Sequence, residues 1–420
     1  MSENIVTSEV NSKSSLVEYS MKVILALQHL IAMFGATVLV PILTGFDPSI
    51  ALVSAGVGTL TFHMVTKRKV PVFLGSSFAF IPVILSVKKM YNGDLTYVQG
   101  GIIVAGLIYV IVSLFVKKIG IKRIEKYLPA QVIGPMIMVI GLNLIPTAYS
   151  MASGNLKIAV ITLGIALVIN FAAKGFIKQL AILIAVTSGY LISLKMGIVD
   201  TKLITEAPLM AMPGFTLPKF SVPAIASIAP VVLAVFMEHV GDVTTNGQVV
   251  GKDFIKDPGL NRTLLGDGLA TMIAGFIGGP ANTTYGENTG VLALTKNYNP
   301  AILRLTAVFA ILLGFISKIG GVLKSIPVPV MGGISLMLFS MIALIGVKTI
   351  KNSKVEFNVK NIIIMITILV LGFGSGIIEK HLGITLGIPI TETVKITGLS
   401  FAAIVGVLLN IVLNGRVKQA

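Results

Sequence analysis

Two acidic side chains lie one helical turn apart in an otherwise apolar stretch. Glu238 falls within PVVLAVFMEHV, residues 230–240, and Asp242 follows four positions later, with no basic residue within a helical turn of Glu238. Because residues i and i+4 share one face of a helix, both carboxylates are expected on the same side. Two carboxylates this close in an apolar environment resist simultaneous ionisation, so one of them is expected to hold a proton. The pair therefore predicts a proton-coupling site, unless Glu238 only bonds a neighbouring helix and Asp242 lies in solvent.

A second group of polar residues opens the stretch 279–296, which is otherwise hydrophobic enough to lie in a membrane. The group comprises Pro280, Asn282, Thr283, Thr284, Gly286, Glu287 and Asn288. A backbone interrupted by proline and glycine leaves amide groups that lipid cannot satisfy, and a carboxylate at that depth is costly. We therefore expect the stretch to line an internal cavity, where Glu287 binds a ligand or accepts hydrogen bonds from amides at a helix N-terminus. Asn288 is expected to orient Glu287 or to cap the following helix.

The stretch 70–78, VPVFLGSSF, is interrupted in the same way. An extended backbone here would present N–H groups to the cavity, and Phe78 and Tyr285 would then flank a flat ligand. In the first apolar span, Gln28 and His29 are interpreted as structural hydrogen-bonding groups, with a proton relay through His29 as the alternative. Because no lysine or arginine is expected at this depth, a small neutral planar molecule with N–H and C=O groups, such as a nucleobase, fits the site better than an anion.

The composition indicates a polytopic membrane protein. Of the 420 residues, 55% are hydrophobic and 12% are charged, and the mean hydropathy is +0.94, which leaves too little polar surface for a soluble domain of this size. The formal charge of +16 is better explained by lysine and arginine in short cytoplasmic loops than by binding of nucleic acid. The chain has no cysteine and its four histidines are scattered, so neither a metal site nor an enzyme active site is expected.

Fourteen apolar spans can be drawn along the chain, at roughly 20 residues for each crossing of the lipid bilayer. They lie at 21–45, 49–65, 72–90, 97–118, 127–148, 156–173, 176–196, 222–240, 264–278, 281–296, 300–319, 326–348, 359–379 and 394–415. With residues 1–20 as a cytoplasmic tail, most lysine and arginine residues fall on the inner side. We therefore expect an all-α, multi-pass protein of the cell inner membrane with both termini in the cytoplasm.

Three short segments recur in the same order in the two halves of the chain. Gln28-His29 is repeated as Glu238-His239, and residues 72–78 match residues 282–288, both at an offset of 210 positions. Residues 128–134 match residues 326–332 at an offset of 198. Because seven spans separate equivalent segments and seven is odd, the two halves are expected to be inverted in the membrane. Inverted repeats with interrupted segments near the bilayer midplane are typical of secondary transporters.

These motifs together resemble the nucleobase–ascorbate transporter family along nearly the whole chain. The resemblance is carried by Glu287-Asn288-x-Gly290-x4-Thr295-Lys296, by Gln28-His29 and by the SSFAF and NTTYGEN runs. It implies fourteen segments in two inverted repeats of seven, with short antiparallel strands in segments three and ten. It also implies a core domain of residues 21–126 and 222–325, a gate domain of residues 127–221 and 326–420, and possible homodimers through the gate domains.

The resemblance also implies an activity, namely import of uracil together with a proton, with no cofactor beyond that coupling ion. Glu238 and Glu287 would bond the uracil ring, amides around Phe78, Tyr285 and Gly286 would meet its carbonyl groups, and Phe339 would contribute from the gate domain. Asp242 stands where some members of the family have histidine. A symporter of purine or xanthine is the alternative within the family, although purine-directed members commonly have glutamine in place of Glu287. A channel or an anion exchanger on the same fold is the alternative from another class.

Overall fold

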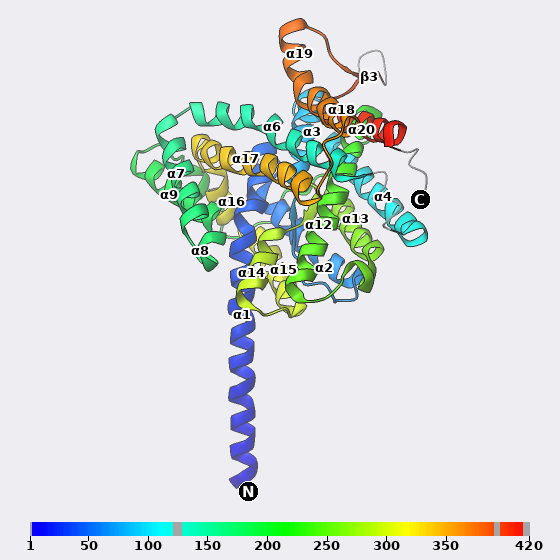
Figure 1. Ribbon diagram of the computed structural model, residues 1–420. Coiled ribbons are helices and arrows are strands. Elements are labelled where there is room, and N and C mark those ends of the chain that lie inside the picture. The colour runs from blue at the N-terminus through cyan, green and yellow to red at the C-terminus, as the bar shows by residue number, and fades with distance from the viewer. Residues whose placement is uncertain (1, 121–127, 390–394, 415–420) are drawn as a thin grey trace.

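The computed structural model describes residues 2–120, 128–389 and 395–414, most of them helical (Figure 1). In the first half, the elements are α1 (Ser2–Thr44), α2 (Pro48–Val65), β1 (Leu74–Ser76), η1 (Phe78–Phe80), α3 (Ile81–Met90), α4 (Thr96–Ile119), α6 (Ala130–Ser153), α7 (Leu156–Ala172), α8 (Gly175–Gln179), α9 (Ala181–Lys195) and α10 (Lys202–Thr205). In the second half, they are α11 (Val222–Ile228), η2 (Ala229–Val231), α12 (Val232–Val250), η3 (Ile255–Gly259), α13 (Leu260–Ile277), β2 (Asn282–Thr284), α14 (Gly286–Thr295), α15 (Pro300–Gly314), α16 (Ser317–Lys324), α17 (Val328–Asn352), α18 (Val359–Leu369), η4 (Val370–Gly374), α19 (Ser375–Leu382), β3 (Gly387–Pro389), β4 (Lys395–Thr397) and α20 (Gly398–Asn414).

Within the described residues, seven helical segments are long and apolar enough to cross a membrane on their own. They are Tyr19–Thr44, Pro48–Val65, Thr96–Lys118, Ala130–Ser153, Val222–Val250, Val328–Asn352 and Val359–Glu379. The pair α15 and α16, bent by 78°, makes an eighth if it forms one span, and α7, α9 and α20 are shorter apolar helices. The chain is therefore a mostly helical, multi-pass membrane protein, and the count of fourteen segments stays a prediction.

Two three-residue strands from distant parts of the chain form one antiparallel ladder. In β1 and β2, Leu74 is paired with Thr284, Gly75 with Thr283 and Ser76 with Asn282, and all six residues are buried. The ladder lies where the two matching stretches of the sequence predict it. The two short antiparallel strands that the resemblance implies are thus confirmed, within the apolar stretches 72–90 and 281–296. Each strand leads into a helix, β1 through η1 into α3 and β2 into α14.

Side chains from the surrounding helices satisfy the backbone near this ladder. Buried hydrogen bonds run from His63 Nε2 to Val72 O (2.9 Å), from Leu74 N to Thr59 Oγ1 (2.9 Å), from Asn246 Nδ2 to Pro71 O (3.0 Å) and from Thr271 Oγ1 to Asn282 O (3.0 Å). The side chain of Asn282 donates in turn to Ser54 O at 3.0 Å. Irregular backbone is tolerated at the depth of a membrane only where protein supplies the partners that lipid lacks. Here α2, α12 and α13 supply them.

Gly75 is the residue of the ladder that leaves room for an aromatic ring. A Cβ atom at this position would overlap the ring of Tyr285 and would lie 2.7 Å from Oγ1 of Thr37. The ring cannot move aside freely, because the Tyr285 hydroxyl donates a hydrogen bond to Ser76 O at 2.9 Å. We expect Gly75→Ala to lower the free energy of unfolding by about 1–3 kcal/mol, since overpacking forces side chains and backbone to shift. Thermal unfolding of the detergent-purified protein measures this loss.

Gly164 in α7 provides the matched control for that substitution. No atom lies within 4 Å of a Cβ built on Gly164, so Gly164→Ala is expected to keep or slightly raise the unfolding temperature, because alanine favours a helix interior more than glycine does. Equal losses of stability in the two variants would mean that the close packing of Gly75 against Tyr285 does not cause the loss in Gly75→Ala.

Glycines also bring two pairs of helices into close contact. Between α4 and α13, a Cβ on Gly106 would lie 2.7 Å from the carbonyl oxygen of Gly268. Between α6 and α17, a Cβ on Gly134 would lie 2.9 Å from the carbonyl oxygen of Gly346. Small residues that let helix backbones approach closely are typical of membrane proteins. As a result, α6 and α17 lie side by side (Figure 1).

Candidate functional site

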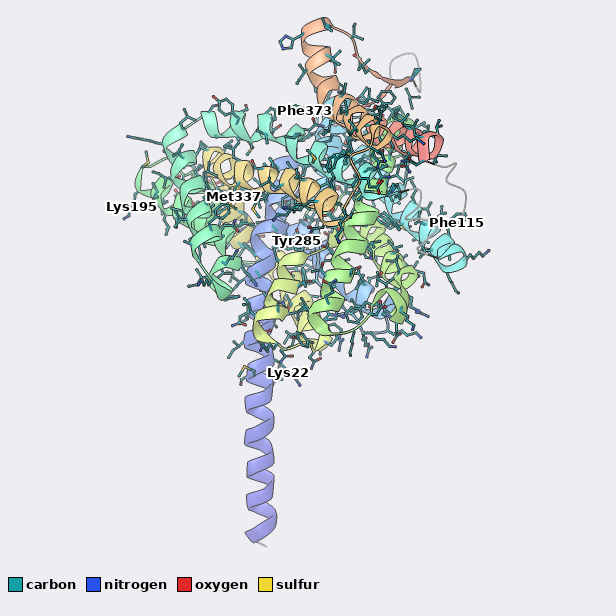
Figure 2. The ribbon with its side chains drawn as sticks, viewed as in Figure 1. Lys22, Phe115, Lys195, Tyr285, Met337 and Phe373 are labelled. Carbon is teal, nitrogen blue, oxygen red and sulfur yellow. The ribbon has the colours of Figure 1, made fainter. Side chains whose placement is uncertain are left out.

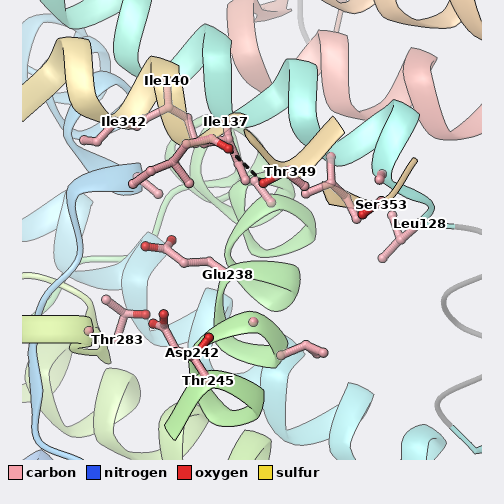
Figure 3. Close-up of a pocket in the computed structure, with 18 of the residues that line it drawn as sticks. Leu128, Ile137, Ile140, Glu238, Asp242, Thr245, Thr283, Ile342, Thr349 and Ser353 are labelled. Atoms are coloured by element: carbon pink, nitrogen blue, oxygen red, sulfur yellow. Dashed lines mark hydrogen bonds between the residues drawn. The ribbon is translucent and has the colours of Figure 1, made fainter. Parts of the chain in front are cut away.

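A cavity of about 970 Å³ lies between two groups of elements. One side is formed by α12, β2 and the start of α14, and the other by α6 and α17. The three carboxylic acids singled out in the sequence, Glu238, Asp242 and Glu287, all line this cavity. Figure 3 shows Glu238 and Asp242 on the same side as Thr283, facing the helices above them. The structure therefore brings the acidic pair and the interrupted stretch together in one site.

The short helix η1, which begins at Phe78, and the helix α14, which begins at Gly286, both start beside this cavity. Phe78, Tyr285 and Gly286 line it, and Tyr285 lies near the centre of the molecule (Figure 2). The first amides of a helix have no partner within the helix, so those at the start of α14 are available to an acceptor in the cavity. The amide of Tyr285 is an exception among those predicted to meet a ligand, because it donates to Phe73 O at 3.0 Å. The amide of Gly286 remains a candidate, whereas the amide of Glu287 donates to the carboxylate of its own side chain.

The electrostatic character of the cavity is acidic. Its described lining residues include four carboxylic acids, Glu238, Asp242, Glu287 and Glu356, and no lysine, arginine or histidine. The ion pairs found in the described part of the chain do not involve these side chains. In surroundings of low dielectric constant, such carboxylates must be balanced by protons or by hydrogen-bond donors of a ligand. The cavity is therefore suited to a neutral ligand rich in donors, and not to an anion.

Asp242 is held in place by the second strand. Its Oδ2 atom accepts a hydrogen bond from Thr284 Oγ1 at 2.9 Å. Thr284 is the last residue of β2, so the ladder that shapes the cavity also orients this carboxylate. Asp242 is half-buried and lines the cavity with Glu238. It is thus accessible from the cavity, which a group that exchanges protons requires.

His29 and Asn288 bond to each other beside the site. Asn288 Nδ2 lies 3.1 Å from His29 Nδ1 and donates to His29 O at 3.1 Å. Since an amide nitrogen can only donate, Nδ1 of His29 must accept, and the ring is the tautomer protonated on Nε2. Both residues are buried and neither lines the cavity, so their bond fixes α14 against α1. Gln28 is half-buried and also lies outside the lining.

The opposite side of the cavity differs from the prediction. Phe339, expected to contribute from this side, is fully buried among core residues and does not line the cavity. Its neighbours Leu338, Met341 and Ile342 on α17 line it instead, together with Ile133, Ile137 and Ile140 on α6. Sequence reasoning missed these aliphatic residues. The segments that contain the starts of these two helices do recur in the sequence, at 128–134 and 326–332. Neither this repeat nor the predicted gate domain identified which of their side chains line the cavity.

A second buried polar pair lies outside the cavity. His239 Nδ1 is 3.4 Å from Asp267 Oδ2, and both side chains are fully buried. Neither residue lines the cavity. In the part of the chain that the structure describes, no group of three or more histidine, aspartate and glutamate side chains is placed to hold a metal ion.

Comparison with known proteins gives a consistent set of relatives. A model of the permease family matches residues 20–380. The uracil permease of Bacillus caldolyticus is 42% identical over 412 residues, which cover 94% of this chain and 93% of that protein. The uracil permease of Bacillus subtilis (strain 168) is 39% identical and covers 99% of this chain and 97% of its own length. That of Escherichia coli (strain K12) is 39% identical over 92% of this chain and 90% of its own length.

Solved structures of similar fold are more distant in sequence. Murine Slc26a9, an anion transporter in the inward-facing state, matches with a TM-score of 0.71 and 11% identity over 95% of this chain and 69% of its own. The chain spans 64% of a second SLC26A9 structure, with a TM-score of 0.67, 12% identity and 94% of this chain covered. The transmembrane domain of the cyanobacterial bicarbonate transporter BicA matches with a TM-score of 0.61 and 13% identity, over 93% of this chain and 96% of that domain. At these identities the likeness concerns the fold alone.

Proposed function

This chain belongs to the permease family, and from that premise we propose that it imports uracil across the cell membrane together with a proton. It is a transporter and not an enzyme, as the family and its relatives indicate. The observation that carries the proposal is the single cavity that unites Glu238, Asp242 and Glu287 without a basic residue in its described lining. Such a site suits a neutral, donor-bearing ring and a proton.

The chemistry of uracil complements the polar side of the cavity. The ring carries two N–H donors and two C=O acceptors around one edge, and the carboxylates of Glu238 and Glu287 accept the donors. The amide of Gly286, at the start of α14, donates to a carbonyl oxygen. Phe78 and Tyr285 line the cavity nearby and offer aromatic surface to a flat ring. An analogue without the N–H groups would leave a carboxylate unpaired, which is the basis of selectivity.

The proposed cycle moves a core domain against a gate domain. In this proposal the core domain, residues 21–126 and 222–325, holds the polar side of the cavity, and the gate domain, residues 127–221 and 326–420, holds the aliphatic side. The two are built from fourteen segments in two inverted repeats, which the pairing of β1 with β2 supports. The cavity extends to Leu128 and to Ser353, next to a lysine-rich stretch of the chain. The positive-inside rule therefore assigns its opening to the cytoplasm.

Coupling to a proton supplies the driving force in this proposal. A proton bound by Glu238 or Asp242 removes one negative charge from the acidic pair, which favours binding of the substrate and permits the loaded site to move. Each charge that crosses a potential of 100 mV contributes about 2.3 kcal/mol, which corresponds to roughly fiftyfold accumulation. Release of uracil and the proton to the cytoplasm then resets the site.

Two other functions make different predictions. A symporter of purine or xanthine would be inhibited by xanthine and guanine at low concentration, whereas a uracil carrier would not, so competition with labelled uracil separates them. A channel or anion exchanger is the alternative from another class, and two solved structures of similar fold are named as a bicarbonate transporter and an anion transporter. The described lining of this cavity, with four carboxylic acids and no cation, disfavours that second function because an anion would meet only like charge.

Uptake of radiolabelled uracil into liposomes tests the proposed function. With an alkaline lumen, the purified protein is expected to give saturable uptake and accumulation above the external concentration. A protonophore is expected to abolish the accumulation but not the exchange of internal for external uracil. Uptake that neither saturates nor responds to the pH gradient would refute proton symport, and absence of uracil uptake would refute the substrate.

A further inference from the structure

The cavity is much larger than the substrate proposed for it. Its volume of about 970 Å³ lies near the upper end of the range of about 300–1,000 Å³ that is typical of sites for drug-sized ligands. Uracil is a single six-membered ring with two oxygen atoms. A bound uracil on the polar side would therefore leave most of the cavity free.

The free part of the cavity has its own chemical character. Part of its surface is formed by Ile133, Ile137 and Ile140 on α6 and by Leu338, Met341 and Ile342 on α17, here called the aliphatic wall; polar residues such as Gln131 and Thr349 lie farther along the same helices. Spacings of three and four positions place each set on one face of its helix. Figure 3 shows Ile137, Ile140 and Ile342 across the cavity from Glu238 and Asp242. The ligand space thus has a polar side and an apolar side that face each other.

The edges of the uracil ring divide in the same way. N1–H, C2=O, N3–H and C4=O form a continuous polar edge, while C5 and C6 form the remaining carbon edge. When the polar edge meets the carboxylates and the Gly286 amide, the carbon edge is turned toward the aliphatic wall. We propose that the aliphatic wall is a second subsite, which binds an apolar substituent on the C5–C6 edge of a uracil ring. This inference rests on the proposed function for the orientation of the ring.

A ligand that fills both subsites is expected to act as an inhibitor. It would contact α12 and β2 on one side and α6 and α17 on the other, and it would therefore oppose any movement of these elements relative to one another. Uracil itself occupies only the polar side and leaves this movement free. The ligand class is thus a 5-alkyluracil, with an affinity above that of uracil and no accumulation in liposomes.

Competition with radiolabelled uracil for the detergent-purified full chain measures the gain in affinity that the 5-alkyl group provides. We expect 5-butyluracil to bind about tenfold more tightly than uracil, since each buried methylene group can strengthen binding several-fold. The isosteric 5-(3-hydroxypropyl)uracil is expected to lose most of this gain because its hydroxyl meets aliphatic side chains. The isomer 3-butyluracil is expected to bind far more weakly than uracil, because its N3 atom can no longer donate to a carboxylate.

Two variants on α17 test whether the gain in affinity comes from contacts with the aliphatic wall. Ile342→Ser is expected to reduce the ratio of 5-butyluracil affinity to uracil affinity to within about threefold. Leu344→Ser is the matched control, because Leu344 is two positions away, is 56% exposed and lies outside the cavity lining. This control is expected to keep the wild-type ratio. Equal ratios in the two variants would overturn the assignment of the subsite to the aliphatic wall.

The outcomes separate this inference from the proposed function. If wild-type protein binds uracil but 5-butyluracil binds no more tightly, the aliphatic wall is only a packing surface and the inference fails alone. If 3-butyluracil binds as tightly as 5-butyluracil, binding follows hydrophobicity without recognition of the ring, and the inference is again overturned. If wild-type protein binds no uracil at all, the proposed function fails first.

Discussion

Replacing Glu287 or Glu238 by glutamine is expected to weaken uracil binding about thirty- to hundredfold. Glutamine keeps the size of the side chain but replaces a charged acceptor by an amide, and hydrogen bonds to charged groups contribute about 1.5–3 kcal/mol each. Both carboxylates line the same cavity, so each substitution removes one of two acceptors for the N–H groups of the ring. Equilibrium binding of labelled uracil to the detergent-purified variants measures the effect.

Glu356 is the matched control for these two substitutions. It also lines the cavity, but its side chain is exposed and it lies beyond the end of α17, away from the polar side. Glu356→Gln is expected to change uracil affinity less than threefold, because solvent screens an exposed charge. Wild-type affinity in Glu287→Gln would refute the assignment of that residue to the binding site. Equal losses in all three variants would point to the overall charge of the cavity and not to specific hydrogen bonds.

Replacing Asp242 by asparagine is expected to abolish accumulation of uracil driven by a pH gradient. Asparagine can still accept the hydrogen bond that Thr284 donates to Asp242 at 2.9 Å, so the local geometry is kept while the proton-binding group is lost. The ratio of internal to external uracil in liposomes should then fall to about one. Exchange of internal for external uracil should persist, because it needs no net movement of protons.

Asp253 supplies the control for the loss of an aspartate. It is exposed, and its Oδ1 atom accepts from the backbone of Lys256 at 3.2 Å, away from the cavity. Asp253→Asn should accumulate uracil as the wild type does. Accumulation by Asp242→Asn under an imposed pH gradient would instead assign the coupling proton to Glu238.

The sequence was most informative where polar residues interrupt apolar stretches. The two interrupted stretches, residues 72–78 and 282–288, hold the strands β1 and β2, which the family resemblance implied as a short antiparallel pair. The cost of unpaired amides and carboxylates in lipid placed Glu238 and Glu287 in an internal cavity, and the structure has both in the lining of one cavity. These inferences worked because few arrangements satisfy such groups within a membrane.

Aliphatic residues carried no comparable signal. Ile137 and Ile342 line the cavity, while Phe339, three positions before Ile342, is buried in the core. In a membrane helix every face is apolar, whether it meets lipid, another helix or a cavity, so hydropathy cannot tell these faces apart. The sequence also did not predict which buried polar groups bond to each other. The bond between Asn288 and His29, for example, joins residues 259 positions apart.

Some predicted ends of the apolar spans were wrong for a related reason. The span predicted to end at residue 240 continues as α12 to Val250, although hydropathy falls at Gly241 and Asp242. Polar residues in this extension, such as Thr245 and Asn246, face the cavity or the backbone near the ladder, and the helix therefore persists where the sequence no longer looks like membrane. The bend of 78° between α15 and α16 likewise had no counterpart in the hydropathy pattern.

The ladder of β1 and β2 has a consequence for biogenesis. The hydroxyl of Tyr285 and the carbonyl of Ser76 that it bonds are 209 positions apart. A nascent chain that ends before β2 therefore has one strand of the ladder and lacks the strand that pairs with it. The backbone groups of β1 that pair with β2 have no strand partner until β2 has been synthesised. Until then, α2 or the insertion machinery must shield them from lipid. Two separately synthesised fragments that divide the chain between α9 and α11 should accordingly bind uracil only after they are combined.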